Sequence, residues 1–289
     1  MIDIRVVLCP LDFSTMSSVE VALATEVCET FGSHLILHHN LAAASPGLVR
    51  VWEWNEVRRG EPVSEAHTAA MLRKALQALP KTVTAEARIT EGPPAAVMLA
   101  LASDIPADLL VLGSHGWSTP DHASLTERIL DGCPCPVLTV KESAATATRF
   151  HLGREAEREL RVAVPVDLSD ASRWPLEYAF ALARRLPTMQ LDLLHVVEER
   201  SIAATRAARG ELDARVPLDL SARTRSVVLE GDPVDEIVGF TEQAGSAFLI
   251  MGEHARGLLR RFFTRDTASA VLHRARCPAW FVPPRGDRG

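Results

Sequence analysis

An internal duplication constrains this chain more than any other feature of its sequence. The segment Arg5–Ser14 aligns with Arg161–Ser169, which places Asp12 on Asp167. Further matches follow in the same order: Glu91-Gly with Glu230-Gly, Leu109–His115 with Phe248–His254, and Cys135-Pro with Cys277-Pro. A repeat of this kind indicates one structural unit that occurs twice. With 289 residues, the chain is long enough for two domains of about 140 residues each.

The offsets between matched residues locate the domain boundaries and two insertions. We expect domain 1 at 1–142, a linker at 143–158 that is rich in Ala and Thr and then charged, and domain 2 at 159–285. The first copy has an insertion with Trp52 and Trp54, and the second has a longer loop over Arg256–Arg265. Aromatic and arginine side chains in loops are common at interfaces, so both segments are candidate partner or lid surfaces. That each folds over its own core is an equally good interpretation.

Each copy alternates short β-branched runs with longer amphipathic runs, which is typical of βα units and a parallel sheet. Ser17 and Glu20 have the spacing of a capping box at the first helix, and Gly32 follows the end of that helix. The second copy repeats the order from 160–165 to 279–282. In the first copy we predict strands at 4–10, 35–39, 84–90, 109–113 and 137–140, and helices at 17–31, 64–79, 94–103 and 124–131.

Five parallel strands joined by right-handed crossovers predict an open, doubly wound, Rossmann-like sheet in each copy, with strand order 3-2-1-4-5. Ligands of such sheets bind at the carboxyl ends of the strands, where the winding reverses. In this order the crevice lies between the first and fourth strands. Asp12 and the segment from Gly113 to Gly116 would flank it in domain 1. Asp167 and the segment from Gly252 to Ala255 would do so in domain 2.

Composition excludes several classes of protein. The formal net charge of −6 gives no bulk attraction to nucleic acid or to an anionic membrane. Apolar runs such as Ala95–Ala102 are far shorter than the ~20 residues that cross a bilayer, and the N-terminus lacks the pattern of a signal peptide. The five cysteines have no framework spacing, which favours free thiols in a reducing cytoplasm.

The duplicated motifs resemble those of the universal stress protein (UspA-type) family. The resemblance rests on Pro10-Leu-Asp-Phe-Ser14 and its copy Pro165-Val-Asp-Leu-Ser169, together with Asp108–Gly116, Thr126–Leu130, Cys133–Val140 and Leu194–Val197. It implies a tandem member of the family, a stress-response regulator that senses a ligand or binds an unidentified protein partner. It also implies two halves related by a pseudo-twofold axis through their last strands, a cytoplasmic location and a homodimer.

The resemblance further implies a test for nucleotide binding, because binders in this family carry Gly-x-x-Gly, nine residues, and then Gly-Ser/Thr. Domain 1 keeps Gly113 and Gly116, but Ala123-Ser124 follows after six residues. If a nucleotide such as ATP binds there, Asp12 would recognise the base or ribose, and Gly113, His115, Gly116 and Ser124 would line the phosphate side. Domain 2 has Ala255, Arg265 and Asp266 at the matching positions, so we expect no cofactor beside Asp167 and Gly252. An empty, vestigial crevice in both halves stays open as an alternative.

The sequence gives only weak signals for other kinds of functional site. Catalytic motifs of hydrolases, metalloproteases and P-loop proteins are absent, and no lysine falls in a predicted strand-end loop, which disfavours an NTPase. His115 and His254 recur beside the aspartates and His39 and His195 end the second strands, but such loop histidines indicate no metal geometry. Cys133-Pro-Cys135 is interpreted as packing. Two rival functions remain: a weak ATP hydrolase or adenylyl-transferring enzyme on the same crevice, and a scaffold that binds no nucleotide.

Overall fold

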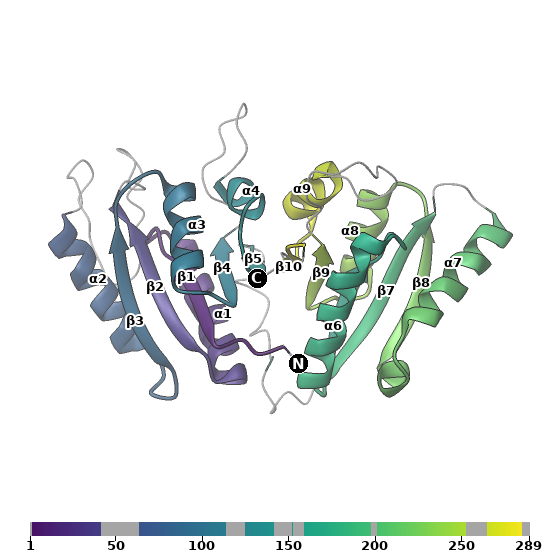
Figure 1. The fold of residues 1–289 in the computed structure, drawn as a ribbon, viewed down its shortest axis with the longest axis horizontal. Helices are drawn as coiled ribbons and strands as arrows, with labels where there is room; N and C mark the ends of the chain where they lie inside the picture. Colours follow the sequence, from purple (N-terminus) through teal and green to yellow (C-terminus); the bar gives the residue numbers. More distant parts are fainter. Residues whose placement is uncertain are drawn as a thin grey trace. The chain divides into compact units, whose positions relative to one another are not determined.

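The chain forms two compact units in the structure, a computed structural model that describes residues 2–41, 64–113, 125–141, 152, 159–197, 201–252 and 265–284. One unit is Asp3–Phe150, which we call the first half. The other is Met1–Ile2 with His151–Gly289, which we call the second half. Both are layered α/β units, coloured along the sequence in Figure 1.

The first half is built on a parallel sheet of the order β3-β2-β1-β4-β5. Its winding reverses between β1 and β4, as the sequence predicts. The strands are β1 (Val6–Pro10), β2 (His34–Asn40), β3 (Thr84–Thr90), β4 (Leu109–Gly113) and β5 (Val137–Val140), and the helices are α1 (Thr15–Phe31), α2 (Glu65–Ala78), α3 (Pro94–Asp104) and α4 (Leu125–Leu130).

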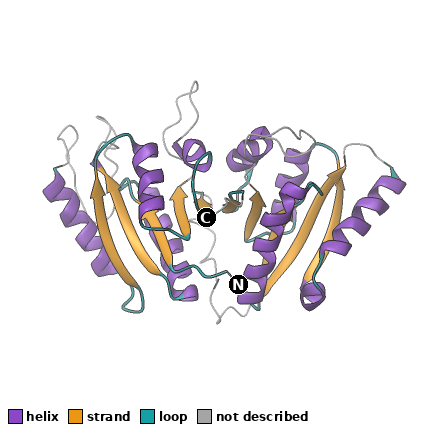
Figure 2. Cartoon of the chain, in the orientation of Figure 1, coloured by secondary structure: helices purple, strands orange, loops and turns teal. Residues whose placement is uncertain are grey.

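The second half repeats this plan, with a parallel sheet of the order β8-β7-β6-β9-β10. Helices lie on both faces of each sheet (Figure 2). The strands are β6 (Leu160–Pro165), β7 (Met189–Val197), β8 (Thr224–Glu230), β9 (Phe248–Gly252) and β10 (Ala279–Val282). The helices are α6 (Arg173–Arg185), α7 (Ile202–Arg215), α8 (Pro233–Gln243) and α9 (Arg265–Arg274), with 3-10 turns η2 (Asp170–Ser172) and η3 (Leu218–Arg223).

Burial along the strands follows their place in the sheet. The central strands β1 and β4 are almost continuously apolar and buried, whereas the edge strand β3 has only half-buried and exposed residues. Central strands of a doubly wound sheet have helices on both faces, so both sets of their side chains must be apolar. Asp108 fixes the amino end of β4, because its Oδ2 accepts hydrogen bonds from the backbone N–H groups of Arg5 and Val6 at 2.9 and 3.0 Å.

Helix α1 begins two residues earlier than its sequence pattern predicts. Ser14 is the N-cap, and its side chain accepts a hydrogen bond from the Met16 N–H at 3.3 Å. The capping box predicted at Ser17 and Glu20 is therefore wrong, since both residues lie inside the helix. The predicted end is confirmed: Gly32 has φ of 73°, and its N–H donates to the Cys28 carbonyl at 2.8 Å. A left-handed residue at this position closes a helix, and glycine adopts it without strain.

No helix in the described part of the chain is both long and apolar enough to cross a bilayer.

Candidate functional site

The first-half crevice lies at the carboxyl ends of β1 and β4. These strands are parallel neighbours, with Val7 opposite Leu109 and Leu8 opposite Leu110. Asp12 follows β1 by two residues, and Gly113 is the last residue of β4. The structure therefore places both predicted residues at the same edge of the sheet, where the winding reverses and where ligands of this architecture bind.

Asp12 is held by a tight turn between β1 and α1. Its Oδ1 accepts hydrogen bonds from the Ser14 N–H at 2.8 Å and from the Ser17 hydroxyl at 3.0 Å. Phe13, between the strand and the helix cap, has φ of 57°, a left-handed conformation that is strained for a large side chain. These bonds fix the carboxylate of Asp12 while the side chain stays exposed to the crevice.

The second half contains the same turn. Leu168 has φ of 63°, and Asp167 Oδ1 accepts from the Ser169 N–H and hydroxyl at 3.0 and 2.6 Å. The Ser172 hydroxyl also donates to this oxygen, as Ser17 does to that of Asp12. Gly252 ends β9 beside β6, so Asp167 and Gly252 lie at equivalent ends of neighbouring strands. Asp167 is half-buried, and its Oδ1 accepts three hydrogen bonds from serines, one more than that of Asp12.

The histidines at the ends of β2 and β7 fasten these turns to the sheet. His39 Nδ1 lies 2.7 Å from the Leu11 carbonyl oxygen, and His195 Nδ1 lies 2.7 Å from that of Val166. A carbonyl oxygen only accepts, so Nδ1 is the protonated nitrogen in both. Burial lowers the pKa of His39. Among the residues whose placement is described, no group of three His, Cys, Asp or Glu side chains could hold a metal ion.

Glu20 is part of the first-half crevice, although its sequence pattern suggested a helix cap. The side chain is 7% exposed and lies against Gly113: a Cβ added there would be 2.3 Å from Glu20 Oε1. Burial and, to a lesser extent, the charge of Asp12 raise the pKa of Glu20 from 4.5 to about 8, while hydrogen bonds to the Gly113 backbone and the Ser17 hydroxyl act in the opposite direction. Glu20 is thus a neutral carboxylic acid at pH 7.

Lys141 also lies nearer the crevice than the sequence suggested. The expectation that no lysine falls at a strand end is wrong, because Lys141 directly follows β5, whose last residue Val140 pairs with Gly113. Its side chain is buried, with 5% exposed. The Thr126 hydroxyl donates to the Gly113 carbonyl at 3.1 Å and ties α4 to the same edge.

Several predicted site residues lie outside the described part of the chain. They are His115, Gly116 and Ser124 in the first half and the segment from His254 to Arg261 in the second, together with Trp52 and Trp54. Their roles stay predictions.

The family model of the universal stress proteins matches the chain twice, over residues 3–141 and 160–283. The chain belongs to the universal stress protein family. The expected tandem arrangement of two such domains is confirmed. A comparison with curated proteins found no match.

Solved structures show the same tandem fold. A universal stress protein from Archaeoglobus fulgidus DSM 4304 is similar with a TM-score of 0.66 and 18% identity, over 99% of this chain and 98% of that one. A putative universal stress protein from Pseudomonas aeruginosa UCBPP-PA14 gives 0.61 and 16%, over 97% and 94%. The cytoplasmic domain of a prokaryotic cation chloride cotransporter gives 0.53 and 12%, over 96% and 94%. At these identities the likeness concerns the fold.

The cysteines of this universal stress protein are free thiols. Cys133 and Cys135 are buried, and their Sγ atoms are 3.6 Å apart. The hydrogen bond with Cys135 lowers the pKa of Cys133 against the effect of burial. Both pack beneath the start of β5, in agreement with the structural role expected from the sequence.

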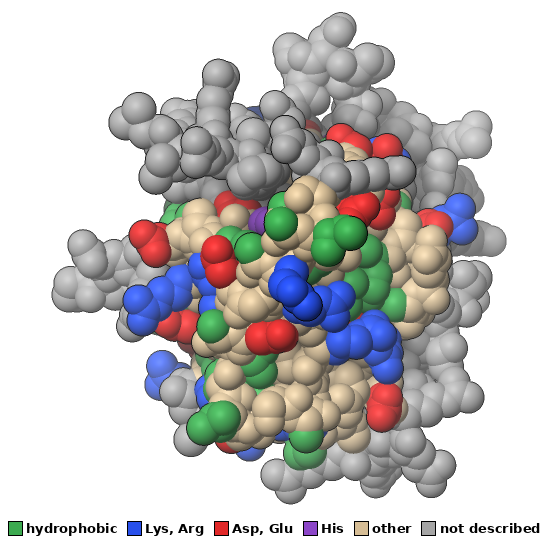
Figure 3. Space-filling view, turned by 90° about the vertical axis from the view of Figure 1, so that its right-hand side faces the viewer, with side chains coloured by type: hydrophobic (Ala, Val, Ile, Leu, Met, Phe, Trp, Pro, Cys, Tyr) green, Lys and Arg blue, Asp and Glu red, His purple; other side chains and the backbone are tan. Residues whose placement is uncertain are grey.

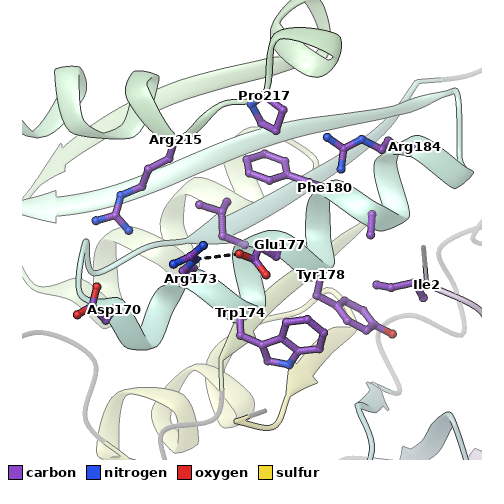
Figure 4. A pocket seen from close by; sticks show the side chains of 12 residues that line it. Ile2, Asp170, Arg173, Trp174, Glu177, Tyr178, Phe180, Arg184, Arg215 and Pro217 are labelled. Atoms are coloured by element: carbon purple, nitrogen blue, oxygen red, sulfur yellow. Dashed lines mark hydrogen bonds and ion pairs between the residues drawn. The ribbon is translucent and has the colours of Figure 1, made fainter.

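The second universal stress domain has a hollow of about 790 Å³ along α6 (Figure 4). Trp174, Tyr178 and Phe180 supply its apolar lining. Its arginines are engaged: Arg173 Nε donates to Glu177 at 2.9 Å, and Arg184 Nε donates to Asp219 at 2.7 Å.

The outer surface of this domain has mixed chemistry. Basic side chains gather in the middle of the face shown in Figure 3, next to apolar ones and with acidic ones around them. Ile202 and Leu218, in the second half, are 91% and 94% exposed. Exposed apolar groups beside charges are common at protein contacts, so this domain offers surface for the partner-binding alternative.

Proposed function

We propose that this protein is a stress-response regulator that binds a nucleotide, with ATP as the first candidate, in the crevice of the first half. One observation carries the proposal: Asp12 and Gly113 meet at the reversal of winding, with Asp12 fixed by its own turn. A carboxylate held in this way accepts hydrogen bonds from ribose hydroxyls or a base amino group. Gly113 adds no side chain of its own at this edge, as phosphate sites require, and the side chain that lies against it is that of Glu20.

The first half supports this function better than the second. Asp12 is exposed and its Oδ1 accepts two hydrogen bonds from serines, whereas Asp167 is half-buried and its Oδ1 accepts three. Asp167 therefore has less capacity left to accept a bond from a ligand. The sequence of the second half adds Asp266 where the family pattern has Ser or Thr, and a carboxylate beside phosphate is repulsive. We propose one nucleotide per chain.

Calorimetric titration of the full chain with ATP at pH 7 tests this function. Asp12→Ala removes an acceptor for the ligand, and a hydrogen bond to a charged group contributes ~1.5–3 kcal/mol, so we expect the Kd to rise about 10- to 150-fold. Asp167→Ala is the matched control because it removes the equivalent carboxylate from the turn of the other half, and the Kd of this variant should equal that of the wild type. Equal effects of both variants, or no binding by the wild type, would refute the proposal.

The same samples separate the rival functions. Release of phosphate or transfer of an adenylyl group that is lost in Asp12→Ala would favour the enzyme. An empty crevice in protein purified under mild conditions, with no binding in solution, would favour the scaffold. The homodimer and the cytoplasmic location are predictions of their own. Light scattering after size-exclusion chromatography tests the first, and cell fractionation tests the second.

A further inference from the structure

We propose that Glu20 is a hydrogen-bond donor to the bound ligand, and that it makes the first-half crevice select phosphate-bearing anions only while its carboxyl group is neutral. This inference rests on the proposed function and names the residue that would contact phosphate oxygens of the ligand. Glu20 lies in the second turn of α1, 7% exposed, with Oε1 against the end of β4 at Gly113.

The other oxygen of Glu20 has no hydrogen-bond partner. Oε2 is buried and is unsatisfied within the described part of the chain. Leaving a buried polar atom without a partner is costly, so Oε2 indicates a missing partner. A protonated carboxyl carries one O–H donor. An oxygen of a ligand that enters beside Gly113 would supply the acceptor.

The groups around Glu20 keep it protonated. Asp12, in the loop after β1, acts on it with a like charge, and this interaction and burial raise its pKa. Cys9 faces it from β1, and burial raises the pKa of that thiol as well. From β4 only the Gly113 backbone acts on it, and Ser17 does so from α1. No cation is among these groups; the nearest in strand order, Lys141 after β5, is one strand beyond β4.

The charge state of Glu20 decides what the crevice accepts. The neutral acid donates a hydrogen bond to a phosphate oxygen, and a donor to a charged acceptor is among the stronger hydrogen bonds. The ionised form has no donor and repels the same oxygen. Glu20 thus performs the donor role that a lysine performs in other phosphate sites, but only below its own pKa.

The second half lacks this device. When Asp12 is aligned with Asp167, Ser17 falls on Ser172 and both serines donate to the aspartate, but Glu20 falls on Pro175 in α6. The two aspartate turns are alike, but the second half has a proline where the first has Glu20. Proton-dependent binding is therefore a property of the first half alone.

ATP titrations of the full chain between pH 6.5 and 9.5 test this inference. For the wild type we expect a constant Kd below the pKa of Glu20 and then a rise that approaches tenfold per pH unit. Glu20→Gln keeps an N–H donor at every pH, so its Kd should stay flat. Glu29→Gln, an exposed glutamate near the end of the same helix, is the matched control and should follow the wild type. Circular dichroism confirms that each variant is folded.

The possible results separate this inference from the proposed function. A wild-type protein that binds ATP with the same pH dependence as Glu20→Gln would overturn the donor role and leave the nucleotide site intact. Failure of the wild type, Glu20→Gln and Glu29→Gln to bind at every pH would overturn both. Loss of the pH-dependent step in Glu20→Gln alone, with tight binding retained, is the expected result.

Discussion

Gly113→Ala probes the contact on which the crevice depends. A Cβ at this position would be 2.3 Å from Glu20 Oε1 and 3.4 Å from Glu20 Cδ, with Met16 Cβ at 3.9 Å. The first distance is far below van der Waals contact, so the carboxyl group must move and lose its hydrogen bonds to Gly113 and Ser17. Overpacking of this kind costs ~1–3 kcal/mol of the free energy of unfolding. In a Glu20→Ala background the obstacle is gone, and the same change should cost less than ~0.5 kcal/mol.

Urea unfolding of the four proteins of this cycle, followed by circular dichroism, measures the coupling. We expect an interaction energy of ~1–2 kcal/mol between the two positions, which is the range for residues in contact. ATP titration of Gly113→Ala gives a second reading, because the displaced carboxyl group would enter the crevice. If Gly113→Ala is equally costly with and without Glu20, the carboxyl group does not lie against this glycine and the account of the site is wrong.

Three further predictions concern groups of known burial. The folded protein holds a proton on Glu20 up to about pH 8, whereas the unfolded chain releases it near pH 4.5. The free energy of unfolding of the wild type should therefore fall relative to that of Glu20→Gln between these pH values, with a limiting slope of ~1.4 kcal/mol per pH unit in urea titrations. Parallel curves for the two proteins would contradict the raised pKa. Cys133 has a lowered pKa and Cys9 a raised one, so iodoacetamide should modify Cys133 before Cys9, as peptide mass spectrometry would show; faster labelling of Cys9 would contradict this order. Asp192 is 1% exposed and accepts from Arg225 at 2.8 Å. Arg225→Ala should therefore lower the thermal midpoint by an amount equivalent to ~1–3 kcal/mol, because it leaves a buried carboxylate with Arg161 as its remaining arginine partner. An unchanged midpoint would contradict this.

Most of the fold could be predicted from the internal duplication of the sequence. Because both copies show the same alternation, each ambiguous run in one could be checked against the other, and the strand order follows from right-handed crossovers. Asp12 and Gly113 were predictable as neighbours for the same reason: parallel strands place their carboxyl ends at one edge of a sheet. Their meeting depends on topology alone and needs no knowledge of side-chain packing.

Glu20 was not predictable by this route. A serine followed three residues later by a glutamate has the same spacing whether it caps a helix or lies inside one, and the difference depends on where the chain turns. Here the cap is at Ser14, so Glu20 lies inside the helix, where its side chain meets the end of β4 at Gly113. The burial of Lys141 was missed for a related reason, since a residue just past a strand gives no sequence signal of what covers it.

The aspartate turn is self-contained, and this has a practical consequence. In both halves the serines that donate to the aspartate Oδ1 lie within five residues of it, so the local geometry needs little help from the rest of the domain. A segment of this kind is a portable module. Exchanging 11–20 with 166–175 would transplant the acid together with its frame, and would show whether a recognition property can be moved between the halves of a single polypeptide.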